Sequence, residues 1–244
     1  MILIVGETHD DILYFDSVLA NRREETILGR FTVSIGTLFS QEIVIAHHLF
    51  SSSLSSAILM NILDNYYVDL VISVGRCMSA SDRVKDGDII VSKKVIEANV
   101  DLSMFTEVSI AQIPGFDQTF DVQEDILKYI SQGLERRTAV NYHQVTVLST
   151  DNMASQMVNM LKAKHPIFAM DNELVVIDQN SSGVAVASTL KEVPFIVVKV
   201  VENDLGSSKN IVTYSNVLTR YIDLGKAVIA TINDISRSDI LEGE

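Results

Sequence analysis

The sequence predicts an α/β protein, a three-layer αβα sandwich built on a central, mixed and twisted sheet. Short apolar runs rich in β-branched residues alternate along the chain with segments whose apolar residues recur at helical spacing. Most of these runs are apolar throughout, as strands are when a sheet is covered on both faces. The 244 residues, 47% of them hydrophobic, are enough to fill one large core.

The expected elements follow one another in a regular order. The first run ends at Gly6, and Asp10 or Asp11 is then a candidate N-cap for the first helix. Strands are expected over residues 2–5, 31–36, 42–46, 69–75, 88–92, 144–149, 174–177 and 194–201. Helices are expected over residues 12–19, 51–63, 123–137, 181–190 and about 214–232.

Domain organisation is predicted from the even composition. No break in composition and no internal repeat marks a second domain, so residues 1–233 are expected to form a single domain. A polar tail over residues 234–244 is expected to follow it.

Charge and cysteine usage exclude several classes of protein. The net charge of −13 would repel phosphates, so a nucleic acid is not an expected partner. No apolar run is long enough to span a membrane, and the N-terminus MILIVGETHDD resembles a core strand rather than a signal peptide. The single cysteine, Cys77, excludes an internal disulfide framework and fits a reducing compartment, so we expect a cytoplasmic protein.

Polar residues follow several of the expected strands, where ligands bind in α/β folds. These places are residues 6–11, 47–53, 75–81, 149–153, 178–180 and the stretch KVVENDLG at 199–206. The pattern predicts a site for a polar small molecule.

Several motifs occur in a particular order along residues 1–233. They are GETHDD at 6–11, VDLVISVG at 68–75, DGDIIVS at 86–92, AQIPGF at 111–116, STDNM at 149–153 and VPFIVVKVVEND at 193–204. This order resembles the purine nucleoside phosphorylase/uridine phosphorylase superfamily. Within it, the chain is most similar to the bacterial 5′-methylthioadenosine/S-adenosylhomocysteine nucleosidases.

The resemblance implies a hydrolase that acts on an adenosine-type thioether nucleoside and releases adenine and a thioribose. The implied ligand is a small purine nucleoside, with no cofactor. A homodimer is also implied, in which the partner subunit helps to close the pocket. The reaction needs an acid near the leaving purine, an aligned water under C1′ and an anionic acceptor for the ribose hydroxyl groups.

The water-positioning carboxylate of the family falls on Asp11, with Asp10 beside it as an alternative. Asp11 is one carbon shorter than the family's Glu. The competing interpretation of Asp11 is a helix N-cap or first-turn acid, favoured by the helix dipole.

The ribose-binding Glu of the family falls on Asn180, with Gln179 and Asp178 just before it. An amide can hydrogen-bond a hydroxyl group but supplies no charge. A second alignment places Asp171 to Glu173 there and needs an insertion in the next helix.

The family's acid falls on Asn203, while Asp204 stands one residue later and Glu202 one residue earlier. Asn203 can donate a hydrogen bond to a purine but cannot deliver a proton at neutral pH. A shift of one residue would bring Asp204 into the site. The alternative interpretation is an ordinary polar exit from the strand.

Other pocket positions also depart from the family pattern. Arg76 and Cys77 replace the glycine-rich turn after VISVG; Arg76 could hold an anion or form a salt bridge, and Cys77 is favoured as a small buried residue. Met153, with Asn152 beside it, matches a position that packs on the purine in the family; the alternative interpretation is an ordinary core methionine. No third ligand accompanies the pair His47 and His48, so no metal site is predicted.

Two hypotheses follow from these departures. The chain is either an active N-ribosyl hydrolase or phosphorylase that works through Asp11 and Asn203 or Asp204, or a silent family member that binds a nucleoside or a protein partner.

Overall fold

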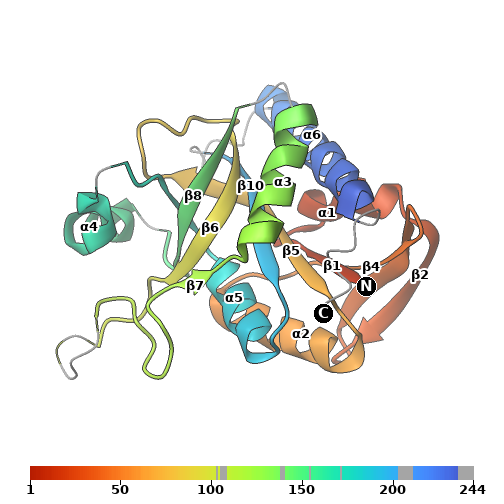
Figure 1. Cartoon of the computed structure of the whole chain (residues 1–244), viewed down its shortest axis with the longest axis horizontal. Coiled ribbons are helices and arrows are strands. Elements are labelled where there is room, and N and C mark those ends of the chain that lie inside the picture. The colour runs from red at the N-terminus through yellow and green to blue at the C-terminus, as the bar shows by residue number, and fades with distance from the viewer. Residues whose placement is uncertain are drawn as a thin grey trace.

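The computed structural model describes residues 1–102, 104, 109–137, 141–153, 155–170, 172–202 and 211–235 (Figure 1). Its strands are β1 Ile2–Val5, β2 Ala20–Ile27, β3 Phe31–Leu38, β4 Gln41–Ala46, β5 Leu70–Ser79, β6 Ile89–Glu97, β7 Phe120–Asp121, β8 Tyr142–Ser149, β9 Val175–Asp178 and β10 Phe195–Val201. Its helices are α1 His9–Ser17, α2 Ser52–Asn65, α3 Glu124–Arg137, α4 Ser155–Lys164, the 3₁₀ turn η1 Pro166–Ala169, α5 Ser181–Leu190 and α6 Ile211–Ile235.

The strands form one mixed sheet, in the order β10-β6-β8-β9-β5-β1-β4-β3-β2, with β7 beside β6. Strand β1 runs parallel to β4 and β5, and β10 runs parallel to β5. Because β10 also pairs with β6, the strands β10, β6, β8, β9 and β5 close into a ring. The predicted mixed sheet with flanking helices is confirmed.

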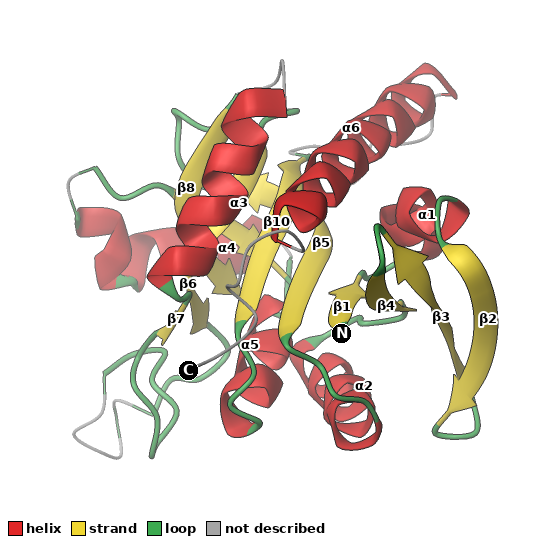
Figure 2. Ribbon diagram, turned by 45° about the vertical axis from the view of Figure 1, so that its right-hand side comes forward, coloured by secondary structure: helices red, strands yellow, loops and turns green. Residues whose placement is uncertain are grey.

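Helices cover the sheet on two sides (Figure 2). Helix α6 packs against α1 and α3 on one side, and α2 packs against α5 on the other. The α2–α5 contact is close, because a Cβ atom added at Gly183 would lie 2.2 Å from the carbonyl oxygen of Ser52. The strands between these layers are almost wholly buried, which explains their continuous apolar sequences.

The sequence analysis missed β2 because its residues are polar and mostly exposed. This strand pairs antiparallel with β3 at the edge of the sheet, and charged side chains such as Arg22, Arg23 and Glu24 are typical of edge strands. The predicted strands at 69–75 and 88–92 are each longer in the structure, as β5 and β6.

The N-cap of α1 was also placed wrongly. The cap is Thr8, whose side chain accepts from the backbone N–H of Asp11, and the Asp11 side chain accepts in return from the N–H of Thr8. This reciprocal pair is a capping box. Across the described residues, no helix is both long and apolar enough to cross a bilayer.

Candidate functional site

The carboxyl ends of β1, β5 and β10 bring the predicted site residues together. Strands β1 and β10 each run parallel to β5, with Val5 opposite Ser73 and Val201 opposite Cys77. The backbone N–H of Glu202 donates to the carbonyl of Cys77 at 2.8 Å, which joins the exits of β10 and β5. The turn that opens α1 therefore lies beside the ends of both strands.

A cavity of about 250 Å³ opens at this edge. Among the predicted residues, it is lined by Arg76, Cys77, Met153, Asp178 and Gln179. Glu7 and Ile177 also line it. The cavity therefore lies between the carboxyl ends of β1, β5 and β9 and the segment that follows β8.

Asp11 does not line the cavity; it is fixed by the capping box and only 2% exposed. Its Oδ2 accepts from the backbone N–H of Thr8 at 2.7 Å, while its Oδ1 is buried and has no hydrogen-bond partner among the described residues. Burial raises the pKa of Asp11, against the hydrogen bonds from Thr8 and the charges of Lys199 and Arg76. One carboxylate oxygen is therefore fixed by a hydrogen bond, and the other is buried with its hydrogen-bonding capacity unused.

Gly75 makes room for this carboxylate. Its φ of +138° is a conformation that side-chain-bearing residues rarely adopt, and an added Cβ would lie 3.3 Å from Cγ of Asp11. The end of the VISVG motif is therefore shaped around Asp11.

Lys199 forms the centre of a buried polar cluster that we call the Lys199 cluster: Lys199, Asp178, Asn180 and Glu7. Its Nζ lies 2.6 Å from Asp178 Oδ2, 2.6 Å from Asn180 Oδ1 and 3.5 Å from Glu7 Oε1. Lys199 and Asn180 are fully buried. Although burial opposes the charge, Asp178 and Glu7 hold the pKa of Lys199 above its ordinary value.

Arg76 belongs to a second group, the Arg76 cluster: Arg76, Glu202, Asp11 and Tyr221. Its Nη1 lies 3.8 Å from Glu202 Oε2, and its side chain remains 34% exposed. Burial raises the pKa of Glu202, with Arg76 opposing the shift, and within the described part of the chain its Oε2 has no hydrogen-bond partner. Arg76 is therefore a partly exposed salt-bridge residue at the cavity wall, as one of the two interpretations expected.

The remaining predicted residues lie in different places. Cys77 is buried, and loss of solvation raises the pKa of its thiol, so it is unsuited to act as a nucleophile. Asn152 is exposed and does not line the cavity, although its neighbour Met153 does. Asn203 and Asp204 lie outside the described residues.

Asn180 is fully buried and is not one of the residues that line the cavity. Its Nδ2 is buried and donates to none of the residues that the structure describes. For the second alignment, Asp171 lies outside the described residues. Glu173 points elsewhere, because it pairs with Lys93 at 3.1 Å and accepts from Thr146.

The sequence analysis missed Glu7 and Lys199 as site residues. Both carried a signal, since a lysine inside the apolar run FIVVKVV and a glutamate directly after a buried strand each need a buried partner. Lys199 supplies the positive charge and Glu7 the negative charge of one ion pair. The two residues are 192 positions apart in the sequence, so their pairing could not be predicted from local patterns.

The imidazole rings of His9, His47 and His48 lie next to one another. His47 and His48 have ring centroids 4.0 Å apart, and His9 lies 5.5 Å from His47. Burial, with His48 and His9 nearby, lowers the pKa of His47 to about 4. Within the part of the chain that the structure describes, no three His, Cys, Asp or Glu residues are grouped to hold a metal ion.

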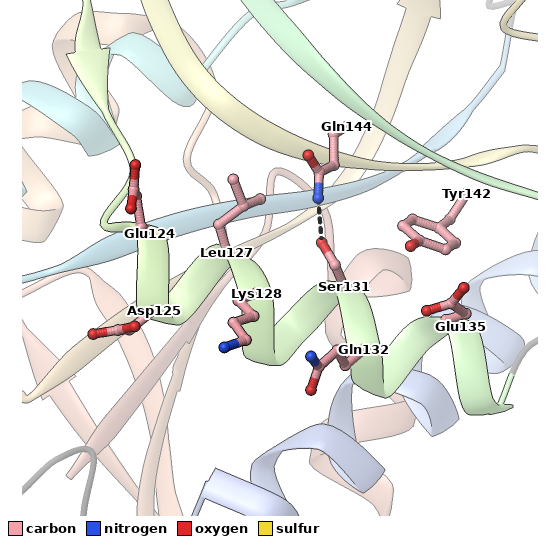
Figure 3. A pocket seen from close by; sticks show the side chains of 9 residues that line it. All are labelled: Glu124, Asp125, Leu127, Lys128, Ser131, Gln132, Glu135, Tyr142 and Gln144. Atoms are coloured by element: carbon pink, nitrogen blue, oxygen red, sulfur yellow. Dashed lines mark hydrogen bonds between the residues drawn. The ribbon is translucent and has the colours of Figure 1, made fainter.

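A second, larger cavity of about 530 Å³ lies along the outer face of α3 and the first residues of β8 (Figure 3). Its wall carries Glu124, Lys128 and Glu135, and Gln144 donates to Ser131 across it at 3.0 Å. Its lining comes from α3 and the first residues of β8, whereas the smaller cavity brings together residues at the carboxyl ends of β1, β5, β8 and β9. We therefore assign the functional site to the smaller cavity.

Comparison with known proteins agrees with this architecture. The chain is 21% identical over 215 residues to the 5′-methylthioadenosine/S-adenosylhomocysteine nucleosidase of Geobacillus sp. (strain WCH70), covering 86% of this chain and 88% of that protein. It is 24% identical over 182 residues to the enzyme of the same name from Buchnera aphidicola (strain APS), covering 74% and 75% of the two chains.

Solved structures show the same fold. The nucleosidase of Neisseria meningitidis, in complex with methylthio-immucillin-A, superimposes with a TM-score of 0.84 at 16% identity, over 96% of this chain and 98% of that one. The Streptococcus pneumoniae enzyme with a transition-state inhibitor gives 0.83 at 18% identity, over 96% and 99%. The family model described as "Phosphorylase superfamily" matches residues 2–232, and the chain belongs to this superfamily.

Proposed function

We propose that this protein hydrolyses the N-glycosidic bond of an adenosine-type nucleoside, with methylthioadenosine and S-adenosylhomocysteine as the expected substrates. The observation that carries the proposal is the buried Asp11 carboxylate: one oxygen accepts from the Thr8 N–H, and the other lacks a hydrogen bond among the described residues. Glu7 and Arg76, which act on its charge, line the cavity at the strand ends. Membership of the superfamily and the names of its relatives support the same reaction.

Asp11 is proposed to act on the attacking water. When the bond between C1′ and the base nitrogen breaks, the bonding pair leaves with the base and the water oxygen bonds to C1′. The water proton passes to Oδ1 of Asp11, the oxygen without a partner. A pKa raised by burial brings this carboxylate closer to the range in which a general base is effective.

The leaving base also needs a proton or a hydrogen bond. We assign this role to Asn203 or Asp204, which follow Glu202 at the exit of β10. Asp204 can deliver a proton, whereas Asn203 can only donate a hydrogen bond. Glu202, the last described residue before them, is buried beside Arg76, which supports a polar end to the pocket.

The residues of the cavity wall are proposed to bind the rest of the nucleoside. Met153 offers an apolar surface for the purine, while Gln179 and Asp178 offer polar groups to the sugar. Arg76 and Cys77 narrow the space after β5.

The test is to incubate the purified protein with methylthioadenosine, S-adenosylhomocysteine, inosine and adenosine, with and without phosphate, and to measure free base. Release of adenine from the two thioethers without phosphate is expected. If free base is released only when phosphate is present, the reaction is phosphorolysis rather than hydrolysis. If no mixture yields free base, the hydrolase proposal is wrong.

A second candidate, nucleoside binding without turnover, is favoured by Asn180. This residue stands where the family has a ribose-binding carboxylate, yet it is uncharged and its oxygen is occupied by Lys199. Thermal stabilisation by a nucleoside in the absence of any base release would support this candidate.

Two further properties are proposed from the resemblance and the composition. We propose a homodimer, to be tested by light scattering coupled to size-exclusion chromatography. We propose a cytoplasmic location, which fits the single cysteine and is tested by fractionation.

A further inference from the structure

Glu7 is a buried carboxylate with unfilled hydrogen-bonding capacity on the wall of the cavity. The residue is only 3% exposed, and it lines the cavity directly after β1. Its one close partner among the described residues is Lys199, with Nζ 3.5 Å from Oε1, which is long for a hydrogen bond. A carboxylate that is removed from water in this way is stabilised when a ligand donates O–H hydrogen bonds to it.

Asn180 cannot fill the role of a sugar-binding carboxylate. Its Oδ1 accepts from Lys199 at 2.6 Å, its side chain is fully buried, and it does not line the cavity. The same ammonium group contacts Glu7, so the Glu7 carboxylate lies close to the position that Asn180 leaves without a charge.

The charges of the Lys199 cluster do not cancel. Two carboxylates, Glu7 and Asp178, face the single ammonium of Lys199. Asp178 already accepts three hydrogen bonds, from the hydroxyl and backbone N–H of Ser181 and from Lys199, whereas Glu7 has only the long contact with Lys199. The excess negative charge is therefore available at Glu7, on the cavity side.

We propose that Glu7 is the sugar-binding carboxylate of this protein and accepts hydrogen bonds from the vicinal hydroxyl groups of the ribose. Its charge also faces the positive charge that develops on the sugar as the glycosidic bond breaks. The inference rests on the proposed nucleoside site and names the residue that recognises its ribose. The carboxylate has moved from the start of α5 to the turn before α1.

The test measures how each hydroxyl group contributes to binding. The probes are C-nucleoside analogues of adenosine, whose carbon–carbon bond to the base resists hydrolysis, with both hydroxyl groups or lacking one of them. Hydrogen bonds to a charged group contribute about 1.5–3 kcal/mol, so the wild type should bind the deoxy analogues about 10-fold to 100-fold more weakly. We compare the dissociation constant of each deoxy analogue with that of the analogue carrying both hydroxyl groups. In Glu7→Gln this ratio of dissociation constants should fall toward one, because the charged acceptor is gone.

Glu42→Gln, the same substitution at an exposed position, is the control and should keep the wild-type ratio. Circular dichroism checks folding of each variant. If Glu7→Gln does not fold, Glu7→Asp retains the charge on a shorter side chain and should reduce the ratio in part.

The outcomes separate this inference from the proposed function. A wild-type ratio near one, or an unchanged ratio in a folded Glu7 variant, would overturn the role of Glu7 even if the enzyme releases base. A ratio that depends on Glu7 in a protein that releases no base would support the inference while the hydrolase proposal fails.

Discussion

Lys199 and Arg76 occupy opposite kinds of environment within one site. Lys199 is fully buried and has two partners at 2.6 Å, whereas the Arg76 side chain is 34% exposed and its ion pair with Glu202 spans 3.8 Å. Two buried carboxylate oxygens of the Arg76 cluster, Asp11 Oδ1 and Glu202 Oε2, accept no hydrogen bond from the described residues. We infer that the Lys199 cluster mainly stabilises the fold, a role that we call its scaffold role. The Arg76 cluster instead retains carboxylate oxygens that can accept a proton or a hydrogen bond from a ligand. Glu7 is the member of the Lys199 cluster that reaches the cavity.

The largest expected effect is on folding, in Lys199→Met. Removing the ammonium leaves Asp178 and Glu7 buried without their cation, which should lower the free energy of unfolding by about 3–5 kcal/mol. Urea unfolding provides the measurement. Lys191→Met, which removes an exposed partner of Asp64, should cost about 1 kcal/mol or less. Equal losses in both variants would contradict the scaffold role.

Asp11→Asn should separate catalysis from stability. Asn retains an oxygen for the Thr8 N–H but cannot take a proton from water, so base release should fall about 10²-fold to 10⁴-fold. The rate is measured with saturating methylthioadenosine, and the urea midpoint should not decrease. Full activity in Asp11→Asn would refute the assignment of the general base.

The pH dependence of stability should differ between wild type and Asp11→Asn. Because the pKa of Asp11 is raised on folding, the folded state binds this proton more tightly than the unfolded chain. That contribution is present below the ordinary pKa of about 3.9 and is lost as the pH rises through the folded value.

Asp11→Asn should therefore gain stability relative to wild type as the pH rises from about 4 toward neutral, by about 1.4 kcal/mol per unit of raised pKa. Urea unfolding at a series of pH values measures the difference. Asp121→Asn, at an exposed position, is the matched control. A difference that shrinks with rising pH would reverse the sign predicted here.

The smallest expected effect is that of Arg76→Met. Because this side chain is partly exposed and its ion pair is long, the free energy of unfolding should fall by about 1 kcal/mol or less. A loss as large as that of Lys199→Met would remove the distinction between the two clusters.

Much of the fold could be predicted from local patterns. The buried strands and the helices at 123–137 and 181–190 appear where the apolar periodicity places them, because such strands have no polar face to obscure the signal. Strand β2 could not be predicted in this way, since it is an edge strand with charged, exposed residues. Thr8 was passed over as the N-cap because two aspartates follow it within three residues, and either could have capped the helix.

The sequence by itself determined the alternation of strands and helices, the polar residues at the strand ends and the resemblance to a superfamily. These features are local, and each can be read within a few neighbouring residues. Only the tertiary structure decided which charges meet. Glu7 and Lys199 lie at opposite ends of the chain, and they become partners because β1 and β10 both flank β5. Burial then makes that pairing obligatory, since an ammonium group removed from water needs nearby carboxylates. Lys199 also donates to the side-chain oxygen of Asn180, so that this oxygen is occupied. Glu7 is therefore the carboxylate that we assign to sugar binding.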